Sequence, residues 1–154
     1  MEVRVATGNE IALVQQRIAR EWGDPVVARG RRYPIVSLDR CLIAGDFEGV
    51  LAFAVDEKPV CELVAIVADT QWRGVGTALI DALRRELGAG FTQIRLTTTN
   101  DNVDGLRFYQ RRGFRLTALR PGAVDETRRG KPSLPLAGDY GIPIRDEIDL
   151  TLDL

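Results

Sequence analysis

The stretch from Val60 to Ala68 constrains the fold most, because every one of its residues except Glu62 is apolar. A continuous apolar strand of this kind is typical of a central position, covered on both faces. A helical pattern follows closely, from Gly74 to Leu87, with apolar residues recurring on one face. The sequence therefore predicts a buried strand that leads directly into a helix.

Periodicity along the rest of the chain predicts further strands and helices in alternation. The strands are expected over 3–5, 41–45, 48–55, 91–98, 114–119 and 145–154, and the other helices over about 7–22 and 101–112. Residues 24–39 and 121–144 are interpreted as irregular segments, the second as a long loop. This order predicts one α/β (α+β) domain over residues 1–154, with helices on both faces of a mixed, mainly antiparallel sheet of six to seven strands.

Composition excludes several classes of function. The chain of 154 residues carries 21 Lys+Arg and 22 Asp+Glu, so its net charge of −1 gives no global attraction for nucleic acid or an anionic membrane. It has no histidine, which excludes Ser–His and Cys–His catalysis and histidine-ligated metals. Cys41 and Cys61 lie in apolar runs without metal-ligand spacing, so we expect core thiols and no metal. Without an apolar signal region or spanning run, a cytoplasmic location is expected.

The segment that joins the buried strand to the following helix reads Gln71-Trp72-Arg73-Gly74-Val75-Gly76-Thr77-Ala78. Gly74 and Gly76 let the backbone approach a ligand closely, and the first helical N–H groups point outward at the positive end of the dipole. Such a segment favours a phosphate or pyrophosphate, and Arg73 can add a charged contact. A plain strand–helix turn is the alternative. The third glycine of a dinucleotide-binding pattern is absent, because Leu79 stands there.

A second segment, Asn102 to Phe114, has the pattern of a helix that ends at Gly113 and leads into a strand. Together the two segments resemble the GNAT acetyltransferase superfamily. Gln71-x-x-Gly74-x-Gly76 followed by Ala78 looks like its acetyl-CoA pyrophosphate loop. Asn102 to Phe114 looks like its downstream signature, with Gly105 where alanine is usual. The resemblance covers nearly the whole chain and implies the acyl-CoA N-acyltransferase fold.

The resemblance implies that acetyl-CoA is the cosubstrate and indicates where it binds. The pantetheine arm would pair with the backbone of Ile66, Val67 and Ala68, as an added strand does, and would also bond Asn102. Backbone N–H groups would hold the pyrophosphate. The residues concerned are Gln71, Arg73, Gly74, Val75, Gly76, Thr77 and Ala78. The adenosine 3′-phosphate would meet Arg107, Arg111 and Arg112, unless these form only a solvated basic face.

Tyr109 resembles the general acid of the family, which protonates the departing CoA thiolate. Its neighbour Phe108 is expected to face the core. The acceptor amine must lose a proton, and without histidine a carboxylate or ordered water must take it. Glu62 is the candidate base, since a lone charge on a buried strand invites a raised pKa; Asp69 is less suited. A backbone N–H near Val67 or Ala68 would meet the oxyanion.

The predicted function is direct transfer of an acetyl group to a primary amine whose identity the motifs leave open. Segments 23–39 and 121–144 are candidates for acceptor recognition, with aromatic surface or acidic charge. The residues are Trp22, Tyr33, Tyr140, Asp125, Glu126, Asp139, Asp146 and Glu147. A catalytically silent acyl-CoA sensor of the same fold and a dinucleotide-binding regulatory domain are the alternatives. The alternating C-terminal strand could extend the sheet across a homodimer.

Overall fold

The computed structural model describes residues 1–69 and 73–154, and these residues form two compact units. The first unit contains Met1–Val26, Arg32–Ile94 and Leu154. The second contains Val27–Arg31 and Arg95–Asp153. The organisation of residues 1–154 as one domain stays a prediction from the sequence.

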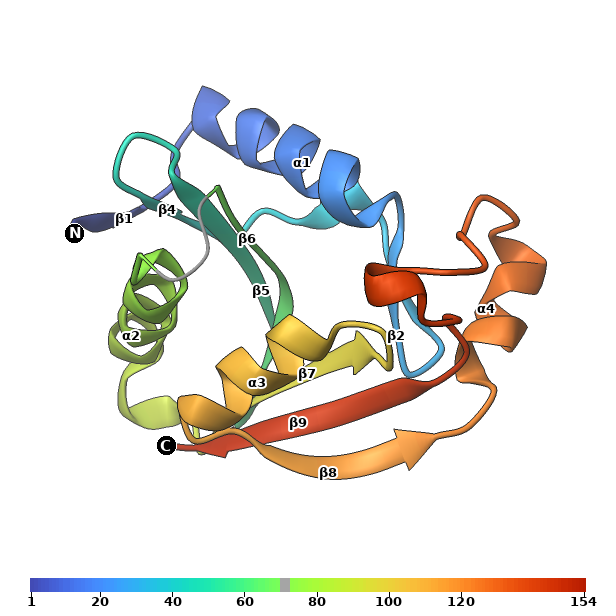
Figure 1. Ribbon diagram of the computed structural model, residues 1–154. Helices are drawn as coiled ribbons and strands as arrows, with labels where there is room; N and C mark the ends of the chain where they lie inside the picture. Colours follow the sequence, from blue (N-terminus) through green and yellow to red (C-terminus); the bar gives the residue numbers. More distant parts are fainter. Residues whose placement is uncertain (70–72) are drawn as a thin grey trace. The chain divides into compact units, whose positions relative to one another are not determined.

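The first unit is built on four antiparallel strands in the order β1-β4-β5-β6. Their bounds are Val3–Val5 for β1, Cys41–Ala44 for β4, Gly49–Glu57 for β5 and Val60–Ala68 for β6. Helices α1 (Asn9–Trp22) and α2 (Val75–Leu87) cover opposite faces of these strands (Figure 1). The strand predicted over residues 60–68 is confirmed at both ends.

The core of the first unit forms where the two helices press apolar stripes onto the strands. Val14 and Ile18 of α1 are completely buried, as are Leu79 and Leu83 of α2. Burying each such side chain contributes about 1.5–3 kcal/mol. At the start of α1 the Glu10 carboxylate accepts the Thr7 N–H at 3.3 Å, which is one half of a capping box.

The second unit orders its strands β7-β9-β8. β7 spans Gln93–Thr99, of which the residues from Arg95 belong to this unit, and β8 (Arg115–Arg120) pairs antiparallel with β9 (Glu147–Asp153). Helices α3 (Val103–Arg111) and α4 (Ala123–Gly130) complete it. β9 lies between two other strands, so it is not a sheet edge, and the predicted extension of the sheet through the C-terminal strand is wrong.

Both segments interpreted as irregular contain short elements. Residues 24–39 hold β2 (Val26–Ala28), β3 (Arg31–Tyr33) and the 3-10 helix η1 (Ile35–Ser37). Residues 121–144 hold α4 and the 3-10 helix η3 (Asp139–Gly141). Elsewhere in the chain, a 3-10 helix, η2 (Gly88–Gly90), follows α2. The long loop predicted over 121–144 is therefore wrong, although the predicted mixed, mainly antiparallel α/β class is confirmed.

Candidate functional site

The end of β6 carries the backbone groups that the resemblance assigns to pantetheine. Its last three residues pair with the start of β5: Ile66 with Leu51, Val67 with Val50 and Ala68 with Gly49. The indole Nε1 of Trp22 donates a 3.3 Å hydrogen bond to the Ile66 carbonyl. A carbonyl oxygen has two lone pairs, so this group keeps the capacity for a second donor.

The predicted pyrophosphate loop includes the first turn of α2. Gly74 is its N-cap at φ 80°, ψ 4°, a left-handed conformation that favours glycine, and a Cβ there would meet nothing within 4 Å. Among the described residues, 1–69 and 73–154, no side chain caps this helix. Within that part of the chain its N-terminal backbone and the positive end of its dipole have no side-chain cap.

Ala78 differs from the other predicted loop residues in the use of its backbone N–H group. The Ala78 N–H donates to the Gly74 carbonyl at 2.9 Å, so this group already serves the helix. The candidate N–H groups for a phosphate are thereby narrowed to those ahead of Ala78. Gln71 lies outside the described residues. Arg73, just before the cap, is exposed.

Asn102 is the N-cap of α3, and both ends of its carboxamide are engaged. Its Oδ1 accepts the Gly105 N–H at 3.1 Å, and its Nδ2 donates to the Thr98 hydroxyl at 2.9 Å. A Cβ on Gly105 would lie only 2.6 Å from the Asn102 Cγ and Oδ1. The glycine that departs from the family pattern thus makes room for this side-chain cap.

Tyr109 is the one residue of α3 that is buried, with 7% of its surface exposed. Its ring packs edge-on against Phe108 and Phe114, at centroid distances of 5.4 and 5.6 Å. Burial raises the pKa of the Tyr109 hydroxyl well above its usual range. The hydroxyl is therefore protonated at neutral pH.

Phe108 is half-buried, and the Arg112 guanidinium lies 4.4 Å from its ring centroid. The expectation that Phe108 rather than Tyr109 faces the core is wrong: the core side of α3 belongs to Tyr109. Arg112 is thus partly engaged in a cation–π contact. Arg107 and Arg111, the other two candidates for the 3′-phosphate, are exposed.

Glu62 lies in the first unit, opposite Ala54 of β5, and only 5% of it is exposed. The sequence-based expectation of a buried carboxylate on this strand is confirmed. Its charge acts on the preceding residue: burial first and the Glu62 charge second raise the pKa of Cys61 to about 12. The structure thus places Glu62 and Ile66–Ala68 on one strand, whereas Asn102 and Tyr109 share α3 and its cap in the second unit.

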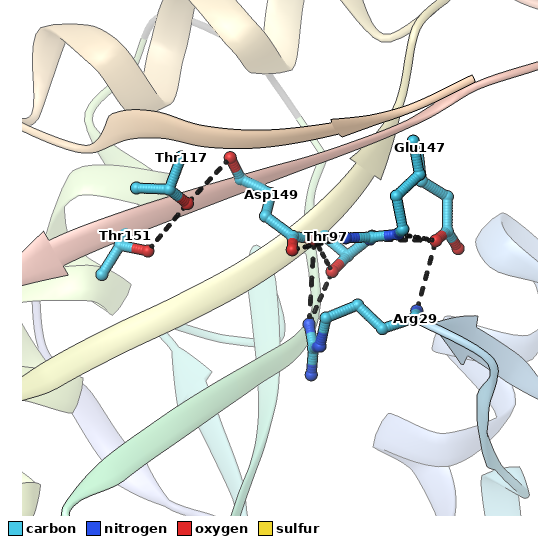
Figure 2. A network of polar contacts seen from close by, with 7 residues as sticks. Arg29, Thr97, Thr117, Glu147, Asp149 and Thr151 are labelled. Carbon is cyan, nitrogen blue, oxygen red and sulfur yellow. Dashed lines mark hydrogen bonds and ion pairs between the residues drawn. The ribbon is translucent and has the colours of Figure 1, made fainter. Parts of the chain in front are cut away.

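Figure 2 shows a polar network in the second unit that the sequence did not reveal. The Arg120 guanidinium donates to both carboxylate oxygens of Asp149 at 2.7 Å, and its Nε donates to Glu147 at 3.1 Å. Arg29 donates to the Thr97 hydroxyl at 2.7 Å, and this hydroxyl donates to Asp149 at 2.6 Å. Glu147 and Asp149 of β9 are both buried.

This network fixes the charge state of its members. Burial raises the Asp149 pKa, but hydrogen bonds from Arg120 and Thr97 outweigh burial, and the pKa lies below the usual 3.8. The same carboxylates hold the pKa of Arg120 above its usual range. Glu147 was expected among surface acids that attract an amine, and this expectation is wrong, because Glu147 is 4% exposed and bonded to Arg120.

Other polar candidates for the acceptor also have contacts within the protein. Asp125 pairs with Arg128 at 2.7 Å, Glu126 pairs with Arg129 at 3.5 Å, and the Asp146 carboxylate accepts the Gly122 N–H at 2.8 Å. The Tyr140 hydroxyl donates to Asp104 at 2.9 Å, although 73% of the residue is exposed.

Two further properties bear on the kind of site. Within residues 1–69 and 73–154, no three cysteine or acidic side chains gather closely enough to hold a metal ion. In the same ranges, every helix is too short or too polar to cross a lipid bilayer.

The fold and the glycine-capped helix after β6 define the class of acyl-CoA N-acyltransferase folds. The family model described as acetyltransferase (GNAT) domain matches residues 37–116. The chain is also 34% identical over 151 residues to the uncharacterized protein YdhI of Bacillus subtilis, covering 94% of each. The chain belongs to the GNAT acetyltransferase family.

Solved structures agree on the fold. An IAA acetyltransferase from Bacillus cereus superimposes with a TM-score of 0.72 at 18% identity, covering 99% of both chains. A Bacillus subtilis acetyltransferase in complex with CoA gives 0.69 at 23% identity, covering 99% of this chain and 98% of its own. At these identities the likeness shows the fold.

Proposed function

We propose that the protein is an N-acetyltransferase that moves the acetyl group of acetyl-CoA directly to a primary amine. The observation that carries this proposal is the start of α2, the helix after β6, where Gly74 is the N-cap and no described side chain caps the helix. Membership of the GNAT family supports it, as does the CoA bound to the Bacillus subtilis relative. A cytoplasmic location and a homodimer remain predictions from the sequence.

In the proposed complex each part of acetyl-CoA has its own partners. Backbone groups of Ile66, Val67 and Ala68 would pair with the pantetheine arm, and the α2 N-terminus with Arg73 would hold the pyrophosphate. Asn102 would bond the pantetheine with its remaining donor and acceptor capacity. The family resemblance supports these assignments.

In the proposed reaction the amine nitrogen attacks the thioester carbon and the C–S bond breaks. The amine first gives a proton to Glu62 or to ordered water, and the departing thiolate takes a proton from the Tyr109 hydroxyl. The nitrogen, positively charged after its attack, releases its second proton to solvent, and solvent reprotonates Tyr109. The products are the N-acetylated amine and CoA as a free thiol. Tyr109 carries its phenolic proton at neutral pH, as a donor must, although the burial that raises its pKa also weakens it as an acid; the family resemblance supports its role.

The Tyr109→Phe variant tests the chemical step. It keeps the buried ring and removes the acidic proton, so kcat should fall at least about tenfold, as expected when a general acid is lost. The affinity for acetyl-CoA should stay unchanged. Titration calorimetry measures the affinity, and thiol release across a panel of amines measures kcat.

A matched control and the alternatives complete this test. Thr117→Val removes an exposed hydroxyl on β8, a strand with no part in the proposed site, and should leave kcat unchanged. Unchanged kcat in Tyr109→Phe would remove Tyr109 from the acid role. Wild-type binding of acetyl-CoA without turnover of any amine would favour the sensor, and NADH binding without CoA binding would overturn the family-based function.

A further inference from the structure

The segment that joins β6 to α2 is held at both of its described ends by one short turn. That turn, Phe47-Glu48-Gly49, leads into β5. At the first end, Gly49 faces Ala68 in the strand register, and the Asp69 N–H donates to the Glu48 carbonyl at 2.9 Å. The pairing between β5 and β6 therefore continues by one hydrogen bond beyond the end of β6, to the turn.

Arg17 of α1 also contacts both the turn and Asp69, the first residue after β6. Its guanidinium donates to the Phe47 carbonyl and pairs with the Asp69 carboxylate. The Arg17 side chain is 14% exposed, whereas that of Asp69 is 61% exposed. Arg17 thus bridges the turn and the residue that leaves β6, with its charge satisfied on both sides.

At the other end of the joining segment, where α2 begins, Gly49 packs closely against the helix. A Cβ built on Gly49 would overlap Cγ1 of Val75, the first residue of α2, and would lie 3.1 Å from both the Leu79 side chain and the Val67 carbonyl. Val75 and Leu79 are 3% and 0% exposed, so neither has room to withdraw. Gly49 has no left-handed φ. The glycine therefore serves the close approach of α2 rather than a special backbone conformation.

We propose that Gly49 and the Arg17–Asp69 pair are positioning residues that set the N-terminus of α2 for the pyrophosphate of acetyl-CoA. This inference rests on the proposed function and names what holds the site in place. A hydrogen bond to a phosphate depends on the donor's position to within a fraction of an ångström. Displacing Val75 should weaken the contact with the pyrophosphate and leave the thioester end unaffected.

The test compares two acyl donors, acetyl-CoA and S-acetylpantetheine, which lacks the pyrophosphate and the nucleotide. In Gly49→Ala, KM for acetyl-CoA should rise about tenfold, the size of one charge-assisted hydrogen bond. KM for S-acetylpantetheine and kcat with either donor should stay unchanged. Gly90→Ala is the matched control, because a Cβ there meets only the end of the Lys58 side chain, and both KM values should stay at wild type.

Asp69→Asn gives a second test with an exposed side chain, which keeps the inference testable if Gly49→Ala fails to fold. Removing a negative charge beside a phosphate site should by electrostatics alone lower KM for acetyl-CoA. If the pair positions the site, KM should rise instead, by about threefold, and Asp69→Glu should restore part of the loss.

The outcomes separate the two proposals. A rise in KM confined to acetyl-CoA supports the positioning role. Equal changes with both donors in Gly49→Ala, or a lower KM in Asp69→Asn, overturn the positioning role and leave the transferase standing. A wild-type protein that neither binds nor uses acetyl-CoA overturns both.

Discussion

At the scale of single residues, Glu62 is the carboxylate that the absence of histidine makes most important. It is buried on β6, four residues ahead of the strand end assigned to pantetheine. A general base acts only in its ionised form, so activity should fall as the pH drops through its pKa. The role proposed for Glu62 therefore predicts a specific pH profile.

In Glu62→Gln the low-pH limb of kcat/KM should disappear, because the group that titrates is gone. The measurement is kcat/KM for a fixed amine between pH 5 and 9, with Glu48→Gln, an exposed glutamate in the same unit, as the control. If the limb persists in the variant, the base is water or another group.

At the scale of elements, β9 shows how a buried strand can carry acids. Glu147 and Asp149 alternate with apolar residues, a pattern that usually means one face in solvent. In β9 the side chains of Glu147 and Asp149 are nevertheless buried, and Arg120 of β8 with Arg29 and Thr97 satisfies both carboxylates. Two fully bonded acids thus take the place of an apolar layer on this face.

Asp149→Asn should lower the free energy of unfolding at pH 7 by about 3 kcal/mol. The variant replaces the buried carboxylate that pairs with Arg120 by a neutral amide. The folded pKa of Asp149 lies below 3.8, so this stabilisation is present above that pH and is lost as the pH falls through the folded pKa. Urea unfolding at a series of pH values measures the difference between wild type and variant.

Asp153→Asn, at the exposed end of the same strand, should change stability by less than about 0.5 kcal/mol at every pH. A wild-type–variant difference for Asp149 that stayed constant down to pH 2 would contradict a role for its charge.

Some elements follow from the sequence and others do not, for physical reasons. β6 was predicted to the residue because burial on both faces leaves an apolar run that only Glu62 interrupts. α4 was missed because it buries a single residue, Val124, and is otherwise held by local pairs such as Asp125–Arg128. Periodicity reports only helices that bury an apolar stripe. The prolines nearby pointed to a loop instead.

The sequence predicted those parts of the candidate site that depend on neighbouring residues. It did not predict contacts between residues far apart in the chain. Gly74 and Asn102 are helix caps, as their positions in the motifs indicate. The Trp22 bond to Ile66 spans 44 positions, and the Arg17 bond to Asp69 spans 52. No spacing rule connects residues so far apart, so neither contact could be predicted.

At the scale of the whole molecule, the path of the chain decides how the two units fold. The chain passes between the units at 26/27, 31/32, 94/95 and 153/154. Neither unit is a continuous segment, and β7 has residues in both. A unit assembled from separate pieces of chain cannot close its core until the other pieces are in place.

We therefore expect the protein to unfold in urea as one cooperative transition. Far-ultraviolet circular dichroism, which follows helices and strands in both units, should coincide with tryptophan fluorescence, to which Trp22 of the first unit contributes. Two separate midpoints would contradict the single domain predicted from the sequence.

The two cysteines make the enzymology simple to follow. Burial, with a smaller contribution from Asp39, raises the pKa of Cys41 to about 11, and that of Cys61 is about 12. Both thiols are buried and protonated at neutral pH, so they react slowly with electrophiles. A thiol-reactive dye added to the native protein should thus report CoA release with little background, which allows continuous assays of every variant described above.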